Sequence, residues 1–350
     1  MNIPEELLGR VLEGKKPCPE LPFTITPLAG DASDRQYFRI NWERPGPQSI
    51  VLMKLAQRPS PPELPFIQIQ EHLCAIGVPV PELYSYSPEL GIVLLEDLGG
   101  ITLENKVKDS LMSEEEIKAL YLEAIDILLQ MQIQGSRPGR DNCPAFQLEF
   151  DVAKFMYELN FFRQYMIEGF LNKRIARQDQ AILEEEFSRL CQILAQEKKY
   201  FTHRDYHSRN IMVREQGLWV LDFQDARLGL CQYDLASLLR DSYVTLPEGL
   251  VEELLEYYLV RKEILKGQKI AARTEFRRLF DFTAVQRNLK ALGTFAFQKV
   301  EKGKDTYLPY IAPTLAYVWQ NLDKYPFFNT LKKVLKKYLD SPGISQPQRR

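Results

Sequence analysis

Three polar side chains that lie close together in the sequence could carry out phosphoryl transfer. Asp205 and Asn210 are separated by four residues, and Asp222 follows Asn210 by 12 residues at the end of an apolar run. In this chemistry one carboxylate lies beside the attacking hydroxyl and accepts its proton, while an amide oxygen and a second carboxylate hold Mg²⁺ on the nucleotide phosphates. We therefore predict that Asp205 is the catalytic carboxylate and that Asn210 and Asp222 bind Mg²⁺ beside ATP.

The same residues also have purely structural interpretations. Asp205 could cap a turn, Asn210 could be a turn residue, and Asp222 could be a carboxylate at a strand end. His203 opens the segment HRDYHSRN and is interpreted as a buried group that orients the loop, with a proton acceptor as the alternative. His203 and His207 have the spacing of a metal-binding pair on a helix, but the flanking apolar residues of β type argue against a helix here.

The elements around these residues must hold them in place. The runs YFTHRD, NIMVRE and LWVLDF are each a few residues long, which predicts short strands on both sides of the loop. Ser113 and Glu116 form a capping box that predicts a helix to about Gln134. Apolar spacing predicts further helices over 152–166 and 179–196, and several between 234 and 339.

The first hundred residues favour a small sheet with one inserted helix. Short runs rich in Ile, Phe, Tyr and Val, broken by Gly, Pro and Asp, predict strands within 21–56 and two more near 82–86 and 91–96. Helical spacing over 62–76 stops at the segment GVP that follows it.

We expect this sheet to bind the nucleotide. The segment GDASDR, which includes Ser33, lies between two strands and could turn its backbone N–H groups toward phosphates, with a plain hairpin as the alternative. Lys54 ends an apolar run and is a candidate cation for the phosphates, with Glu71 as its ion-pair partner 17 residues later. A solvated lysine at the strand edge and a solvated glutamate are the alternatives.

Composition and charge narrow the class of protein. The chain has 350 residues with 45 Lys and Arg against 47 Asp and Glu, so its formal net charge of −2 predicts no general attraction to nucleic acid or anionic membranes. The sequence has no run of 18 apolar residues, so we expect no membrane span, and its first ten residues lack the features of a signal peptide. Five scattered cysteines without a CxxC pair are typical of a reducing compartment. We expect a cytoplasmic protein of two lobes.

These motifs resemble those of the aminoglycoside phosphotransferase-like kinases, bilobal small-molecule relatives of the protein kinases, over about residues 22–330. The family's catalytic loop has the spacing of Asp205 and Asn210, and its metal-binding aspartate corresponds to Asp222. The resemblance implies that Glu96 and Asp97 lie in the hinge between the lobes, which holds adenine through backbone groups.

The resemblance also implies an architecture. It implies an α+β, bilobal protein-kinase-like fold, with a small antiparallel β-sheet lobe that has one helix and a larger, mostly helical lobe. Asp234 matches the family's aspartate that braces the catalytic loop. We therefore expect an N-terminal extension at 1–21, the nucleotide-binding lobe at 22–97, a lobe with the catalytic loop and acceptor site at 98–340, and a flexible tail at 341–350.

Three segments narrow the resemblance within this family. GDASDRQYFRI, FTHRDYHSRNIM and LDFQDARLGLCQYDLASLLRD resemble the bacterial anomeric amino-sugar kinases of cell-wall recycling. This implies ATP-dependent phosphorylation of the anomeric hydroxyl of N-acetylmuramate and N-acetylglucosamine. Only 11 residues separate Asp222 from Asp234, and no Ala-Pro-Glu follows, so a regulated activation segment has no room and a protein substrate is disfavoured. Arg204 then has no phosphorylated residue to bind and is expected to act locally.

The charge of one helical stretch bears on the small-molecule acceptor. Residues 272–304 contain eight basic and three acidic residues, and a basic wall suits a carboxylated sugar better than a polycationic aminoglycoside. Arg287 and Lys290 are the candidate acceptor residues, with a solvated helix face as the alternative. Two other functions are considered: an aminoglycoside or other amino-alcohol phosphotransferase, which the basic helix disfavours, and a kinase-like binding module without catalysis, which the intact catalytic set disfavours.

Overall fold

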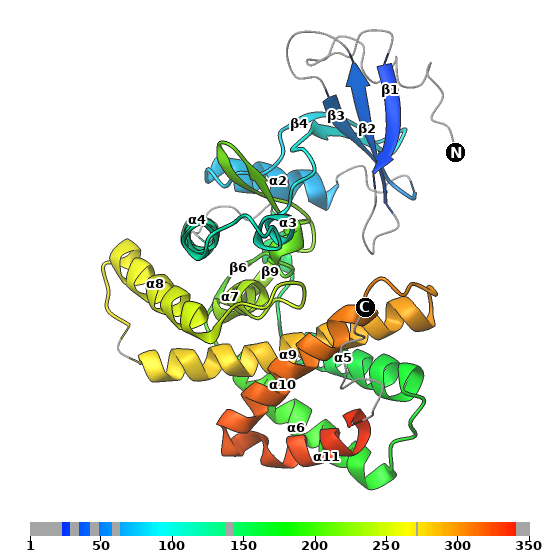
Figure 1. Cartoon of the computed structure of the whole chain (residues 1–350), viewed down its shortest axis with the longest axis vertical. Helices are drawn as coiled ribbons and strands as arrows, with labels where there is room; N and C mark the ends of the chain where they lie inside the picture. Colours follow the sequence, from blue (N-terminus) through cyan, green and yellow to red (C-terminus); the bar gives the residue numbers. More distant parts are fainter. Residues whose placement is uncertain are drawn as a thin grey trace.

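The computed structural model describes six stretches of the chain, namely residues 23–28, 35–42, 49–57, 64–136, 143–270 and 272–340. The expected N-terminal extension at 1–21, the expected tail at 341–350 and Ser33 with most of its loop lie outside these stretches. The described residues form a small sheet lobe at one end of the molecule and a larger helical lobe at the other (Figure 1).

The N-terminal lobe is an antiparallel five-stranded sheet with the strand order β1-β2-β3-β5-β4. Its helix α2 begins with a proline at N1, where the missing N–H costs no hydrogen bond. These elements confirm the strands and the inserted helix that the sequence predicts. Their bounds are β1 (Phe23–Leu28), β2 (Gln36–Trp42), β3 (Ser49–Lys54), α2 (Pro65–Ala75), β4 (Leu83–Ser87) and β5 (Ile92–Glu96).

The two faces of this sheet bury different sets of side chains. Val51 and Met53 of β3 face α2 and the rest of the protein, where Met53 joins the largest core cluster. Because side chains alternate along a strand, the residues between them face the opposite side. That side has a small cluster of its own, formed by Ile40, Ile50, Leu52, Ile92 and Leu94.

The C-terminal lobe is mostly helical and is built on two cores. Helix α4 begins after Ser113, whose side chain accepts a hydrogen bond from the Glu116 backbone N–H in a complete capping box, as the sequence predicts. The helices are α3 (Leu103–Val107), α4 (Glu114–Gln134), α5 (Val152–Phe162), which continues as a π-helix (Arg163–Phe170), α6 (Arg177–Ala195), α7 (Gln232–Leu239), α8 (Glu248–Lys266), α9 (Arg273–Val300), α10 (Ile311–Lys324) and α11 (Asn329–Leu339).

Four short strands interrupt the helices and frame the segment from His203 to Asn210. Strand β7 (Ile211–Arg214) pairs with β8 (Gly217–Val220) as a hairpin, and β6 (Lys199–Thr202) pairs with β9 (Arg227–Leu230). The sequence predicts the first three of these strands but not β9. Since β6 and β8 each end just before a polar segment, they bring His203 and Asp222 to the same place.

Helix α9 passes very close to α5, and a glycine makes this possible. A Cβ atom at Gly293 would lie 2.7 Å from the Cα atom and 2.9 Å from the backbone nitrogen of Phe162. Only a residue without a side chain fits at such a contact. The crossing fixes α9 (gold in Figure 1) against the other helices of the lobe.

None of the helices described is both long and apolar enough to cross a membrane.

Candidate active site

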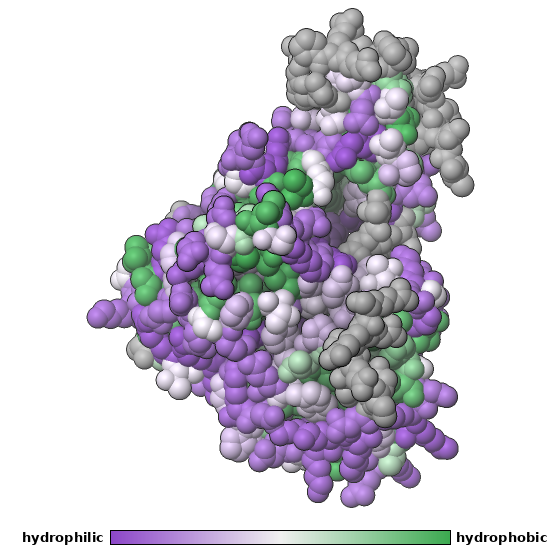
Figure 2. Space-filling model, viewed as in Figure 1, coloured by the Kyte–Doolittle hydropathy of each residue, from purple (hydrophilic) through white to green (hydrophobic). Residues whose placement is uncertain are grey.

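A cleft of about 830 Å³ lies between the sheet lobe and the helical lobe. Figure 2 shows a hollow on this side of the molecule, between the sheet and the helices below it. The polar wall of the cleft comes from the segments that contain Asp205, Asn210 and Asp222 and from α9. The apolar side chains that line the cleft on the side of the sheet include Val51, Phe66, Leu95, Leu98, Met212 and Leu221.

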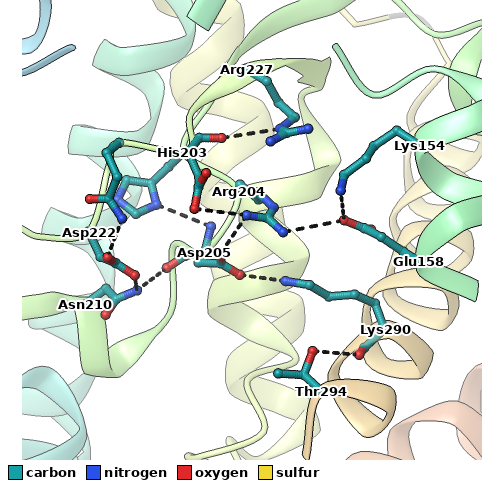
Figure 3. Close-up of polar contacts among 12 residues, drawn as sticks. Lys154, Glu158, His203, Arg204, Asp205, Asn210, Asp222, Arg227, Lys290 and Thr294 are labelled. Carbon is teal, nitrogen blue, oxygen red and sulfur yellow. Dashed lines mark hydrogen bonds and ion pairs between the residues drawn. The ribbon is translucent and has the colours of Figure 1, made fainter. Parts of the chain in front are cut away.

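The structure brings the three predicted catalytic and metal-binding residues together (Figure 3). The Asn210 side-chain amide donates to the Asp205 backbone carbonyl at 2.9 Å, and the same nitrogen lies 3.5 Å from an Asp222 carboxylate oxygen. Because the amide nitrogen is used within the loop, the Asn210 side-chain oxygen is left as an acceptor beside Asp222. Asp222 has a backbone φ of 62°, an uncommon conformation for a residue with a side chain, and such strain concentrates at functional sites.

Asp205 is held as a carboxylate by its neighbours. Burial alone would raise its pKa, but the charges of Lys290 and Arg204 and the hydrogen bond from Lys290 outweigh burial and keep the pKa of Asp205 well below 3.8. The Lys290 ammonium donates to the carboxylate at 2.8 Å, and an Arg204 nitrogen lies 3.9 Å away. Arg204 also pairs with Asp225 at 3.2 Å and lies 3.9 Å from Glu158, so its contacts are local, as expected.

Asp234 lies under the start of this loop and accepts two backbone hydrogen bonds. The N–H groups of His203 and Arg204 donate to its two carboxylate oxygens at 2.6 and 2.9 Å. Arg204 has a φ of 83°, and the second of these bonds holds the backbone in that unfavourable conformation. Burial raises the pKa of Asp234 to about 7, while the two N–H donors oppose the rise.

The two histidines of the loop differ in their contacts. The His203 ring bonds the Leu221 carbonyl through Nε2 at 2.8 Å, and its Nδ1 accepts from the Asp205 backbone N–H at 3.3 Å. Burial lowers the pKa of His203, so the neutral ring links β6 to the end of β8. This geometry favours the interpretation of His203 as an orienting group. Burial and the charge of Arg287 lower the pKa of His207 to about 3, so His207 is also neutral.

The end of β5 and the residues that follow it are tied to both lobes by ion pairs. Glu96 pairs with Arg214 of β7 at 2.5 Å, and Asp97 accepts from Arg39 of β2 at 2.5 and 2.9 Å. The Gly99 N–H also donates to Asp97 at 2.9 Å. Burial alone would raise the pKa of Asp97, but the hydrogen bond from Arg39 lowers it below 3.8. Since the carboxylates are engaged, the backbone of this segment is what the cleft can offer to a ligand.

Sequence reasoning missed Arg39, although the sequence contains a signal for it. Residues 37 and 39 alternate along β2, and the register places Tyr37 opposite Met53 and Arg39 opposite Val51. Both positions therefore share the face of the sheet that borders the cleft. Arg39 lies three positions after the first residue of the strand, and a charged residue in phase with an aromatic residue there indicates a partner for its charge on that face.

The expectation that Lys54 reaches the nucleotide from β3 is wrong. Lys54 lies directly opposite Ile92 of β5, so its side chain shares the face of the separate cluster and points away from the cleft. Glu71 lies on the exposed side of α2. Although both residues are within the described part of the chain, they form no ion pair. The run IVLM before Lys54 is apolar on both faces, so its sequence does not show which face each residue takes.

Only part of the basic stretch on α9 faces the cleft, although its composition predicts a continuous basic surface there. Arg287 and Lys290, the candidate acceptor residues, both line the cleft. Four of the other six basic residues form ion pairs with carboxylates of α9 itself or of neighbouring segments, as a solvated helix face would: Arg273, Arg277, Arg278 and Lys299. Of the eight basic residues in this stretch, Arg287 and Lys290 are the two that line the cleft.

A family model described as the phosphotransferase enzyme family matches residues 24–276 of the chain. The chain belongs to this family. The N-acetylmuramate/N-acetylglucosamine kinase of Neisseria meningitidis serogroup B is 32% identical over 304 residues, which cover 86% of each protein. The protein of the same name from Pseudomonas aeruginosa is 32% identical over 297 residues, covering 82% of this chain and 80% of the relative. As a member of the family, the protein is a phosphotransferase that acts on a hydroxyl acceptor.

Solved structures confirm the fold of this phosphotransferase. The ADP-bound aminoglycoside phosphotransferase APH(2'')-Ib has a TM-score of 0.60 at 16% identity, covering 93% of this chain and 98% of that chain. Choline kinase from Cryptosporidium parvum has a TM-score of 0.61 at 12% identity, covering 95% of each chain. The bilobal protein-kinase-like fold expected from the sequence is therefore confirmed.

Proposed function

We propose that this protein is a cytoplasmic kinase that transfers the terminal phosphoryl group of ATP to the anomeric hydroxyl of N-acetylmuramate and N-acetylglucosamine in the recycling of cell-wall peptidoglycan. The observation that carries the proposal is the convergence of Asp205, Asn210 and Asp222 at one end of the cleft. The names of the curated relatives supply the sugars.

ATP enters the cleft with its adenine toward the sheet lobe. The apolar side chains of Val51, Leu95 and Met212 form a slot for a flat ring, and the backbone of Glu96 and Asp97 supplies hydrogen-bonding groups at its edge. Arg39 fixes that backbone by holding the Asp97 side chain. We assign residues 22–97 to the nucleotide-binding lobe and residues 98–340 to the lobe of catalysis and acceptor binding.

Mg²⁺ would rest on Asn210 and Asp222. An amide oxygen and a carboxylate are ligands that this cation takes in proteins, and it completes its shell with water and nucleotide phosphates. Within the described stretches no three or more His, Cys, Asp or Glu side chains are grouped as a metal site. When bound, it neutralises the charge on the transferred phosphoryl group.

Asp205 directs the acceptor hydroxyl. The sugar oxygen attacks the terminal phosphorus, the bond to the bridging oxygen of ADP breaks, and the hydroxyl proton passes to the Asp205 carboxylate. The ion pair with Lys290 keeps this carboxylate ionised and a weak base. An anomeric hydroxyl is more acidic than an ordinary alcohol, so a weak base that mainly orients the oxygen suits this acceptor. Asp234 and His203 hold the loop in which Asp205 lies.

The experiment is an ADP-release assay with N-acetylmuramate, N-acetylglucosamine, kanamycin and choline as acceptors. We expect turnover with the two sugars and a product whose phosphate is released in mild acid, because glycosyl 1-phosphates hydrolyse there and 6-phosphates do not. A product phosphorylated at the 6-hydroxyl, or kanamycin as a better acceptor than either sugar, would contradict the proposal.

A further inference from the structure

Arg287 is a buried arginine with an unused positive charge at the edge of the cleft. Its side chain lines the cleft, yet the residue is only 4% exposed. Its Nε and Nη1 atoms are buried without a hydrogen-bond partner, and no ion pair joins it to any residue of the described stretches. A buried charge without a partner costs several kcal/mol, so its presence beside a cavity points to an anion that enters from outside.

The carboxylates near Arg287 are already engaged by other donors. Asp234 accepts from the backbone of His203 and Arg204. Asp241 accepts from the Ser208 backbone at 2.9 Å and from the Ser208 hydroxyl at 2.5 Å. The charge of Arg287 acts on both carboxylates, which lowers the cost of burying it, but neither carboxylate bonds to Arg287.

The remaining neighbours of Arg287 do not supply an anion either. His207 is neutral, and Lys290 forms an ion pair with Asp205. Arg287 is therefore free to bind an anionic group of a ligand.

The position of Arg287 on α9 shows which part of a ligand it would meet. Lys290 follows it by three residues, about one helical turn or ~5 Å along the same face, and Lys290 contacts Asp205. A sugar whose reacting hydroxyl lies at Asp205 therefore places a substituent two ring carbons away within reach of Arg287. N-acetylmuramate carries a lactyl carboxylate at C3, two carbons from its anomeric C1, whereas N-acetylglucosamine has a neutral hydroxyl there.

We propose that Arg287 determines acceptor specificity by binding a carboxylate carried by the amino sugar, so that the carboxylated sugar is favoured over its neutral counterpart. This inference rests on the proposed function, because it takes the two amino sugars as the acceptors. The planar guanidinium suits the task, since it can donate two parallel hydrogen bonds to one carboxylate.

An anion could also reach Arg287 as the transferred phosphoryl group, and the two sources are separated by comparing sugars. We expect Arg287→Gln to lower kcat/KM for N-acetylmuramate by about 10- to 100-fold, the effect of a lost charged hydrogen bond. The value for N-acetylglucosamine should change by less than about threefold, because that sugar has no carboxylate to lose contact with. Arg287→Lys keeps the charge and should recover part of the preference.

Two controls keep the test independent of folding. Arg278→Gln removes an arginine of the same helix whose side chain pairs with Glu275 on the surface, and it should leave the preference unchanged. The methyl ester of N-acetylmuramate, assayed with the unaltered protein, should lose the same 10- to 100-fold (about the value of one charged hydrogen bond) as the Arg287→Gln variant does with the free acid.

Each outcome decides a different point. Equal losses for both sugars in the Arg287 variants, or equal rates for the free acid and its methyl ester, would overturn the assignment of Arg287 to the acceptor. Absence of turnover with both sugars in the unaltered protein would instead refute the proposed function itself.

Discussion

Replacing Lys290 with methionine tests how the catalytic carboxylate is kept ionised. Two unit charges 2.8 Å apart attract by roughly 6 kcal/mol at an effective dielectric constant of ~20. After the cost of desolvation, a charge-assisted hydrogen bond retains about 1.5–3 kcal/mol. Removing the ammonium should therefore strengthen proton binding at Asp205 by a similar amount, since burial, which favours the protonated form, is then opposed mainly by Arg204.

The expected result is a change in the pH profile of the enzyme. In the unaltered protein the pKa of Asp205 lies well below 3.8, so protonation of Asp205 should produce no acid limb in kcat/KM between pH 4 and 8. In Lys290→Met the pKa of Asp205 rises, and the acid limb should move to higher pH and enter the measurable range. The measurement is kcat/KM for N-acetylglucosamine between pH 4 and 8, because this neutral acceptor adds no carboxylate of its own that titrates.

A control variant and one refuting outcome test the interpretation that Lys290 keeps Asp205 ionised. Lys299→Met removes an exposed lysine of the same helix that pairs with Asp305, and its profile should match that of the unaltered protein. If Lys290→Met lowers the rate at every pH without moving the acid limb, Lys290 acts on the acceptor or the phosphates and the reasoning about Asp205 is refuted.

Three further predictions concern the metal site, the hinge and Lys54. Asp222→Asn should abolish turnover while nucleotide binding in EDTA, followed by calorimetry, changes little; normal turnover would contradict the metal assignment. Arg39→Met should lower the free energy of unfolding by about 1.5–3 kcal/mol and raise KM for ATP, because Asp97 loses its charged donors. Lys54→Met should leave KM for ATP unchanged, because Lys54 points away from the cleft. Since the pKa of Asp97 is lowered in the folded state, its contribution to the free energy of unfolding is present above about pH 3.8 and is lost as the pH falls further. Urea denaturation measures the difference in this free energy between Arg39→Met and the unaltered protein. A difference that stays constant on acidification would contradict this account.

The convergence of Asp205, Asn210 and Asp222 could be predicted because these residues are close together in the sequence. Asp205 and Asn210 belong to one loop, and a single hairpin of eight paired residues returns the chain to Asp222. Contacts between residues this close in the sequence can be inferred from their spacing and residue types. The capping box at Ser113 is predictable for the same reason, since both of its hydrogen bonds lie within four residues.

Contacts between distant segments could not be predicted in this way. The Arg39–Asp97 pair joins residues 58 positions apart, and the Lys290–Asp205 pair joins residues 85 apart. Lys54 failed for a related reason: the face it takes depends on the register of β3 against β2 and β5, and a strand that is apolar on both faces carries no alternation to reveal that register.

Helix α9 carries both Arg287 and Lys290, whereas Asp205 lies on a separate loop, so the spacing between α9 and α5 bears on the depth of the proposed acceptor site. That spacing depends on Gly293, where any side chain would press on the backbone of Phe162 and push the two helices apart. A substitution at this position would shift Arg287 and Lys290 by the same displacement, because both side chains belong to one helix. Acceptor preference in this family can therefore diverge through a residue that meets no substrate, and a search for specificity confined to the lining of the cleft would pass over it.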